Sequence, residues 1–164
     1  MKESIGASWI LTIVLVFIAL FSGYLAFSVN YSKAFRVKDG IVDRLEKYNG
    51  PNNKSLEEIA EFIGEVNYTS KGKCDTLLGD DRLPSMGVTV GDLHPDIPVS
   101  TNDTYHYCIQ RIKAFSPNDG QLTSSYYKVV VFFSLSLPIF DIGSTFHVDG
   151  ETINIQYPED DYME

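Results

Sequence analysis

The feature that most constrains this chain is an uncharged apolar run, Ser4–Ser32, rich in Leu, Ile, Val, Phe and Ala. It exceeds the roughly 20 residues that a helix needs to cross a bilayer. Trp9 and Tyr31 stand near its two ends, roughly 33 Å apart at about 1.5 Å per residue, as aromatic residues at the two membrane interfaces do. The run predicts a transmembrane segment in residues 1–32, with the span at about 5–31.

A cleaved secretory signal is the alternative interpretation of this run. The apolar core of such a signal is usually about 7 to 15 residues long and ends at a small-x-small site. Here the run is longer, and a cut after Ala26 would put Tyr24 where a small residue is preferred. We therefore expect a retained membrane anchor.

The helix is expected to continue beyond the bilayer as an amphipathic helix over residues 33–50. Gly40 costs an α-helix only about 1 kcal/mol, and Asn49-Gly50-Pro51 supplies a C-cap glycine followed by proline. Apolar residues recur at intervals of three and four, with charged residues between them: Ala34, Phe35, Val37, Ile41, Val42, Leu45 and Tyr48.

A second, short helix is expected at residues 55–66, because Ser55 and Glu58 have the spacing of a capping box before an apolar face. Residues 67–104, rich in Gly, Asp, Pro and Ser, predict a loop with at most a short strand at Met86–Val90.

The β-sheet is expected in residues 105–157. Tyr105–Phe115 and Tyr126–Leu137 have strand patterning, and Asp149-Gly150 resembles the turn of a two-residue hairpin. The acidic tail, 158–164, is expected to be disordered. The fold class is therefore α+β: a long N-terminal transmembrane and amphipathic helix, a second short helix and a small antiparallel β-sheet.

The orientation of the span can be argued in two ways. The positive-inside rule compares Lys2 with Lys33, Arg36 and Lys38, and by itself places the C-terminal domain in the cytoplasm. Residues 33–164, however, hold 12 of the 13 Lys and Arg residues and 21 of the 22 Asp and Glu residues. An acidic, β-rich domain with a cysteine pair is typical of exported domains. We expect a single-pass protein of the cell membrane with an extracytoplasmic C-terminal domain.

Cys74 and Cys108 are the only two cysteines. Outside the cytoplasm they predict one disulfide, which would stabilise the fold by about 3 to 4 kcal/mol for a loop of this length. In a reducing compartment they would be two buried thiols.

Motifs for chemistry are absent from the sequence. His94, His106 and His147 fit no familiar metal spacing, and there is no Gly-x-Ser-x-Gly elbow, His-Glu-x-x-His or phosphate-binding glycine loop. We therefore predict no enzyme, no cofactor and no metal site. The acidic balance argues against nucleic acid as a partner.

A face of small residues follows the span. Ala19, Gly23 and Ala26 lie on one side of the helix, and Asn30 and Ala34 continue that side. Small residues let a second helix approach closely, so we expect lateral packing against other transmembrane helices, with the lipid bilayer around them.

Two segments carry a resemblance to a known family. "GASWILTIVLVFIALF" (Gly6–Phe21) opens the long helix, and "YYKVVVFFSLSLPIF" (Tyr126–Phe140) is a Val-rich strand that runs into Leu-Pro. The chain resembles the type IV pilin-like proteins, and more narrowly the TadE-type minor pilins of tight-adherence (Flp) pilus systems. The resemblance implies a cell-surface role as a structural or assembly subunit of a pilus or secretion apparatus. Its implied partners are pilin-like subunits or the assembly platform.

An alternative from another class is a membrane-tethered extracytoplasmic binding or accessory module unrelated to pili. Such a module would stay in the bilayer as a monomer and recruit a partner through its sheet or its long loop.

Overall fold

The computed structural model describes residues 2–74, 85–90, 95–96, 102–115, 122–134 and 145–156. Its elements are two helices, α1 (Lys2–Lys47) and α2 (Asn53–Glu65), and four strands, β1 (Ser85–Val88), β2 (Tyr107–Phe115), β3 (Leu122–Ser134) and β4 (Thr145–Glu151). This arrangement confirms the predicted α+β class. The acidic tail and the Leu-Pro end of the predicted second strand lie outside the described residues.

Helix α1 is one unbroken helix of 46 residues, as the sequence predicts. It ends in a left-handed cap: Asn49 has φ 56°, Gly50 has φ 135°, and the Gly50 amide donates to the Leu45 carbonyl at 2.8 Å. The first left-handed position is therefore Asn49 and not the expected Gly50, which asparagine allows because it tolerates this conformation better than most residues.

Helix α2 begins two residues earlier than predicted, because its capping box is a different pair. The Asn52 side chain accepts from the Ser55 amide at 3.0 Å, and Ser55 Oγ accepts from the Asn52 amide at 2.9 Å. The predicted partner, Glu58, instead accepts from Lys47 Nζ at 3.0 Å and from the Tyr48 hydroxyl. Glu58 thereby ties α2 to the end of α1.

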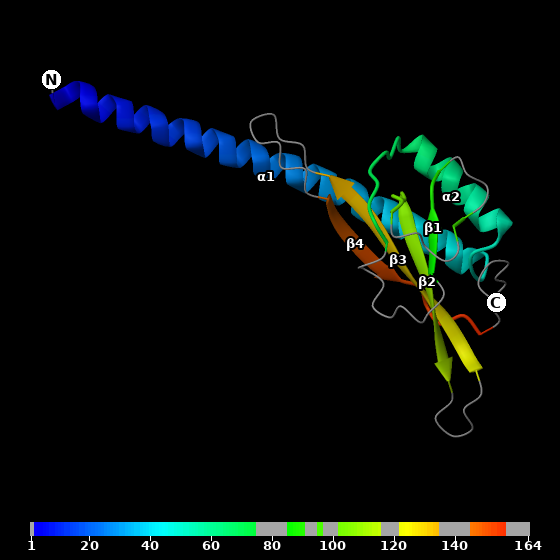
Figure 1. The fold of residues 1–164 in the computed structure, drawn as a ribbon. Helices are drawn as coiled ribbons and strands as arrows, with labels where there is room; N and C mark the ends of the chain where they lie inside the picture. Colours follow the sequence, from blue (N-terminus) through cyan, green and yellow to red (C-terminus); the bar gives the residue numbers. More distant parts are fainter. Residues whose placement is uncertain are drawn as a thin grey trace.

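The sheet is an antiparallel meander in the order β1-β2-β3-β4. Tyr107 of β2 lies opposite Val131 of β3, which lies opposite Val148 of β4. Strands β3 and β4 lie along the C-terminal half of α1, whereas the N-terminal half of α1 extends beyond the domain (Figure 1).

The predicted turn at Asp149-Gly150 is wrong. Both residues pair within β4, opposite Val130 and Val129 of β3. Gly150 has another purpose, because a Cβ atom there would stand 2.4 Å from Cδ of Lys38. The glycine lets the aliphatic part of the Lys38 side chain pack closely against β4. This contact, and not a turn, accounts for the glycine at this position.

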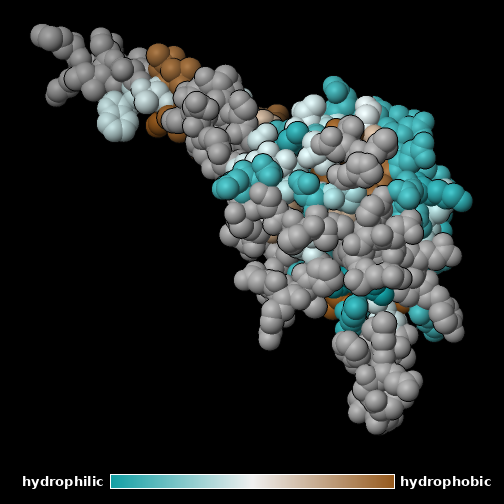
Figure 2. Space-filling view, turned by 45° about the vertical axis from the view of Figure 1, so that its right-hand side comes forward, coloured by the Kyte–Doolittle hydropathy of each residue, from teal (hydrophilic) through white to brown (hydrophobic). Residues whose placement is uncertain are grey.

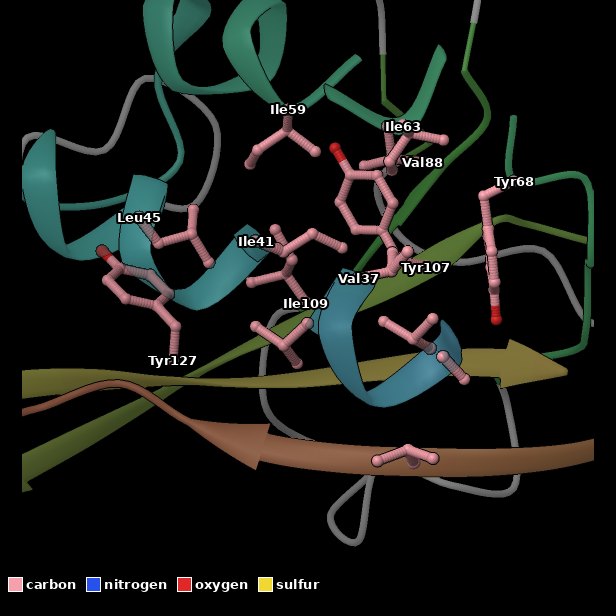
Figure 3. Close-up of a cluster of buried hydrophobic side chains, with 14 of the residues drawn as sticks. Val37, Ile41, Leu45, Ile59, Ile63, Tyr68, Val88, Tyr107, Ile109 and Tyr127 are labelled. Atoms are coloured by element: carbon pink, nitrogen blue, oxygen red, sulfur yellow. The ribbon is translucent and has the colours of Figure 1, made fainter. Parts of the chain in front are cut away.

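The main core lies between both helices and one face of the sheet (Figure 3). In β3 the inward-facing residues are Tyr127, Val129, Val131 and Phe133, the face that strand periodicity predicts. The helices contribute Ala34, Val37, Ile41 and Leu45 from α1 and Ile59 and Ile63 from α2.

A second, smaller cluster covers the outer face of the sheet. It consists of Cys74, Tyr105, Cys108, Val130 and Phe132. Strand β3 is therefore buried on both faces: α1 covers its inner face, and the chain segment after α2 covers its outer face.

Candidate membrane and interaction surfaces

The N-terminal half of α1 exposes its apolar side chains. Trp9 is 70 % exposed, and most of the large apolar residues between it and Val29 are exposed as well. Brown side chains emerge on this projecting helix in Figure 2, while the surface around α2 is largely teal. Within the described residues, α1 is the one helix long and apolar enough to cross a membrane. The chain therefore fits a single-pass membrane protein.

The small-residue face is interrupted by the domain itself. Ala19, Gly23 and Ala26 lie above the sheet and are partly exposed. Ala34, at the foot of the face, is fully buried in the core between α1 and the sheet. The expectation that Ala34 continues the packing surface is wrong, because β3 and β4 already occupy that side of the helix.

An aromatic cluster joins α1 to the end of β3 and β4. The Phe27 ring meets Phe133 at 5.7 Å and Phe146 at 5.8 Å between centroids, and the Tyr31 ring meets Phe133 at 6.0 Å. Phe133 and Phe146 stack at 5.4 Å. Tyr31, predicted as an interfacial residue, is thus also a domain contact.

The sequence analysis does not predict the aromatic cluster, which consists of Phe27, Tyr31, Phe133 and Phe146. The four-residue spacing of Phe27 and Tyr31 indicates that these two rings share one side of the helix. Nothing in the sequence indicates the contact of Phe146, because its neighbour on β3 depends on the strand register.

The basic residues next to the span are partly engaged by the domain. Lys33 Nζ donates to the Asn67 carbonyl at 3.0 Å. Lys38 Nζ lies 2.6 Å from Asp39 and 4.0 Å from the centroid of the Phe35 ring. Lys33 thus contacts the segment after α2, whereas these two contacts of Lys38 lie within α1.

A cleft of about 410 Å³ opens on the outer face at the same end of the sheet. Phe132 lines it, opposite His147 in the β3-β4 register. Two lysines and two threonines also line it: Lys71, Lys73, Thr104 and Thr145.

The histidines do not converge. His106 is buried, and its Nδ1 accepts from the Val90 amide at 3.0 Å. Burial lowers the pKa of His106, and the positive charge of Lys71 lowers it further. His147 is exposed at the cleft, and His94 lies outside the described residues. Among the described side chains, no group of three His, Cys, Asp or Glu is placed to hold a metal ion.

Cys74 and Cys108 form a disulfide in the structure, with Cα atoms 5.8 Å apart. Both are fully buried in the outer cluster. The bond fixes the segment after α2 to β2, next to the cleft.

These surfaces define the class of protein by its architecture alone: an apolar helix that can cross a membrane and a small α+β domain built on its C-terminal half. Comparison of the chain with protein-family profiles, curated proteins and solved structures finds no match.

Proposed function

We propose that this protein is a pilin-like structural or assembly subunit of a surface pilus or secretion apparatus. The observation that supports it best is that the two halves of α1 have different surroundings. Its C-terminal half supplies Val37, Ile41 and Leu45 to the core, whereas its N-terminal half exposes an apolar surface that the domain does not use. A lipid bilayer covers such a surface in the membrane, and neighbouring helices cover it in an assembly.

The position of the small-residue face limits how a neighbour can bind. Ala19, Gly23 and Ala26 lie on the side of α1 that faces the sheet further down, at Ala34. A helix packed on this face therefore stands above the sheet of the first subunit. Such a neighbour has to be offset along the helix axis, and an axial offset is what a fibre of stacked subunits requires.

In this proposal the C-terminal domain is extracytoplasmic. The disulfide supports it, since disulfides persist mainly in oxidising compartments. The Lys33 ammonium donates to the Asn67 carbonyl, so this cation has a contact within the fold that does not depend on orientation.

Cysteine crosslinking in the membrane tests the lateral contact. A cysteine in Gly23→Cys would be the only free thiol, because both native cysteines are paired. Leu25→Cys is the matched control, since two residues turn the side chain by about 200° around the helix. We expect crosslinks to itself or to a pilin-like protein from position 23 and few from position 25. Equal yields, or none at position 23, would refute lateral packing.

Labelling of intact cells tests the orientation separately. Lys113→Cys places a thiol at an exposed site in β2, at the end of the sheet opposite to the aromatic cluster. We expect a membrane-impermeant maleimide to label it before lysis. Labelling only after lysis would mean a cytoplasmic domain.

The second candidate, a membrane-tethered accessory module, is favoured by the aromatic cluster. Phe27 and Tyr31 hold the sheet beside the apolar part of α1, so the domain and its anchor form one body without a neighbour. For this module, crosslinking from position 23 should fail while labelling at position 113 succeeds.

A further inference from the structure

We propose that the cleft beside Lys71 and Lys73 binds the phosphate headgroup of an anionic lipid in the leaflet next to the domain. The inference requires α1 to span a bilayer and does not depend on the pilin-like role. It concerns the protein while it is in the membrane.

The depth of the cleft is set by the aromatic cluster. If Trp9 lies at one interface, Tyr31 lies at the other, roughly 33 Å away along α1. The Tyr31 ring contacts Phe133, and Phe133 stacks on Phe146. Phe146 and Tyr31 are 37 % and 43 % exposed, so this end of the sheet presents aromatic edges to the interface.

The cleft lies at the same level on the opposite face of the sheet. His147 follows Phe146 directly, and successive residues of a strand point to opposite faces about 3.4 Å apart along the strand. Thr145 precedes Phe146 and also faces the cleft. When the aromatic edges rest in the interface, the cleft is therefore at the depth of the headgroups.

The chemistry of the walls suits a phosphate. The ammonium groups of Lys71 and Lys73 can form charge-assisted hydrogen bonds with phosphate oxygens, and the hydroxyls of Thr104 and Thr145 can donate to the same group. Phe132 offers apolar contact to the carbon chain of the lipid.

Among the described residues, two carboxylates adjoin the lining residues in the sequence or along β4, Asp149 and Asp103. Asp149, the next outward residue of β4 after His147, lies 3.9 Å from Lys128 Nζ, which offsets its charge. Asp103 adjoins Thr104 in the sequence, and the two lysines outnumber it.

Native mass spectrometry of the full chain tests the proposal. The protein is purified in mild detergent with equal phosphatidylglycerol and phosphatidylcholine, and the retained lipid is counted. We expect preferential retention of phosphatidylglycerol. In Lys71→Gln/Lys73→Gln this preference should fall about thirtyfold, from roughly 1 kcal/mol for each basic residue near an anionic membrane surface.

Lys54→Gln/Lys113→Gln is the matched control. It removes the same charge from two exposed sites, on α2 and in β2, outside the cleft. Its lipid preference should equal that of the unmodified chain. A similar fall in both double variants, or in neither, would overturn the proposal. Displacement of the lipid by millimolar inorganic phosphate would show a site for free phosphate and would also overturn it.

A second measurement locates the headgroup while leaving Lys71 and Lys73 unchanged. A fluorophore on Ser134→Cys, an exposed position opposite Thr145 in the register and outside the lining of the cleft, is compared with the same fluorophore on Lys113→Cys in vesicles that carry a nitroxide on the phosphatidylglycerol headgroup. We expect strong quenching at position 134 and weak quenching at position 113. Equal quenching would contradict the placement of the cleft at the membrane surface.

Discussion

Gly40 of α1 lies directly against the ring of Phe62 of α2: a Cβ atom at position 40 would stand 2.3 Å from Cε1 of that ring. The guanidinium of Arg44 covers the same ring at 4.2 Å from its centroid, and Arg44 Nη1 donates to the Gly40 carbonyl at 2.7 Å. A glycine about two turns before the end of α1 is thus the condition for the close contact between the two helices.

Gly40→Ala is expected to destabilise the domain although alanine is the better helix former. The gain in helix propensity is about 1 kcal/mol, whereas overpacking costs typically 1 to 3 kcal/mol, so we expect a net loss of roughly 1 kcal/mol. Urea unfolding followed by the near-UV signal of the tyrosines measures it. Gly64→Ala is the control, because nothing lies within 4 Å of a Cβ atom there. An increase in stability for Gly40→Ala would contradict the contact.

Tyr107→Phe should leave the free energy of unfolding unchanged or raise it by up to roughly 1 kcal/mol. The Tyr107 hydroxyl is buried between Ile59 and Ile63 (Figure 3), and none of the described residues accepts from it or donates to it. Burial also raises the pKa of this hydroxyl, since the phenolate would be even less well solvated. Removing the hydroxyl therefore removes a desolvation cost.

Tyr68→Phe is the matched comparison, because the Tyr68 hydroxyl donates to the Phe132 carbonyl. Its loss should cost about 1 kcal/mol. If the two variants lose the same amount, the hydroxyl of Tyr107 has a partner after all.

The free energy of unfolding is expected to fall as the pH drops from about 7 to about 5, in part through His106. The lowered pKa of His106 means that the folded chain binds a proton less readily than the unfolded chain. The contribution of His106 is therefore fully present above its ordinary pKa of about 6.5 and is lost as the pH falls from there through its folded pKa.

His106→Asn isolates this contribution. An asparagine oxygen can accept from the Val90 amide as Nδ1 does, without titrating. Chemical unfolding at a series of pH values should give a flatter profile for the variant between about pH 7 and pH 5. A slope equal to that of the unmodified chain would exclude His106 as a source.

Replacing both cysteines, Cys74→Ser/Cys108→Ser, should lower the free energy of unfolding by about 3 to 4 kcal/mol, given the 34-residue separation. Thermal unfolding with and without reductant measures it. Reduced unmodified protein should match the double variant. Insensitivity of the unmodified protein to reductant, with the variant less stable, would mean that the serines and not the lost bond cause the effect.

The sequence predicted those parts of the fold that local patterning controls. The periodicity from Ala34 to Leu45 located the buried side of α1, and alternation from Tyr127 to Phe133 located the inner face of β3. Such patterns can be predicted from the sequence because the spacing of apolar residues along one element shows which of its sides is buried.

Features that depend on register or on contacts between elements could not be predicted in this way. Asp149-Gly150 has the composition of a turn, but both residues pair with β3, and the glycine at position 150 leaves room for the side chain of Lys38. Likewise Ser55 and Glu58 match a capping box, yet Asn52 lies nearer the turn after α1 and takes the N-cap.

The candidate surfaces divide in the same manner. Trp9, Tyr31 and the small-residue face follow from the sequence of a single helix. The aromatic cluster and the cleft do not, because they combine α1 with β3 and β4, or residues 71–73 with β4, across gaps in the sequence that only folding closes.

Because α1 is unbroken, it also fixes the rotation of the domain relative to the span. There is no hinge between Ala26 and Ala34, so the direction in which the sheet faces is set by the rotation of the span about its own axis. One residue inserted between Ala26 and Phe27 would turn the domain by about 100° relative to the small-residue face while raising it only about 1.5 Å. A neighbour that grips the span would then meet a different side of the domain, so the number of residues between the two halves of α1 encodes an orientation as well as a length.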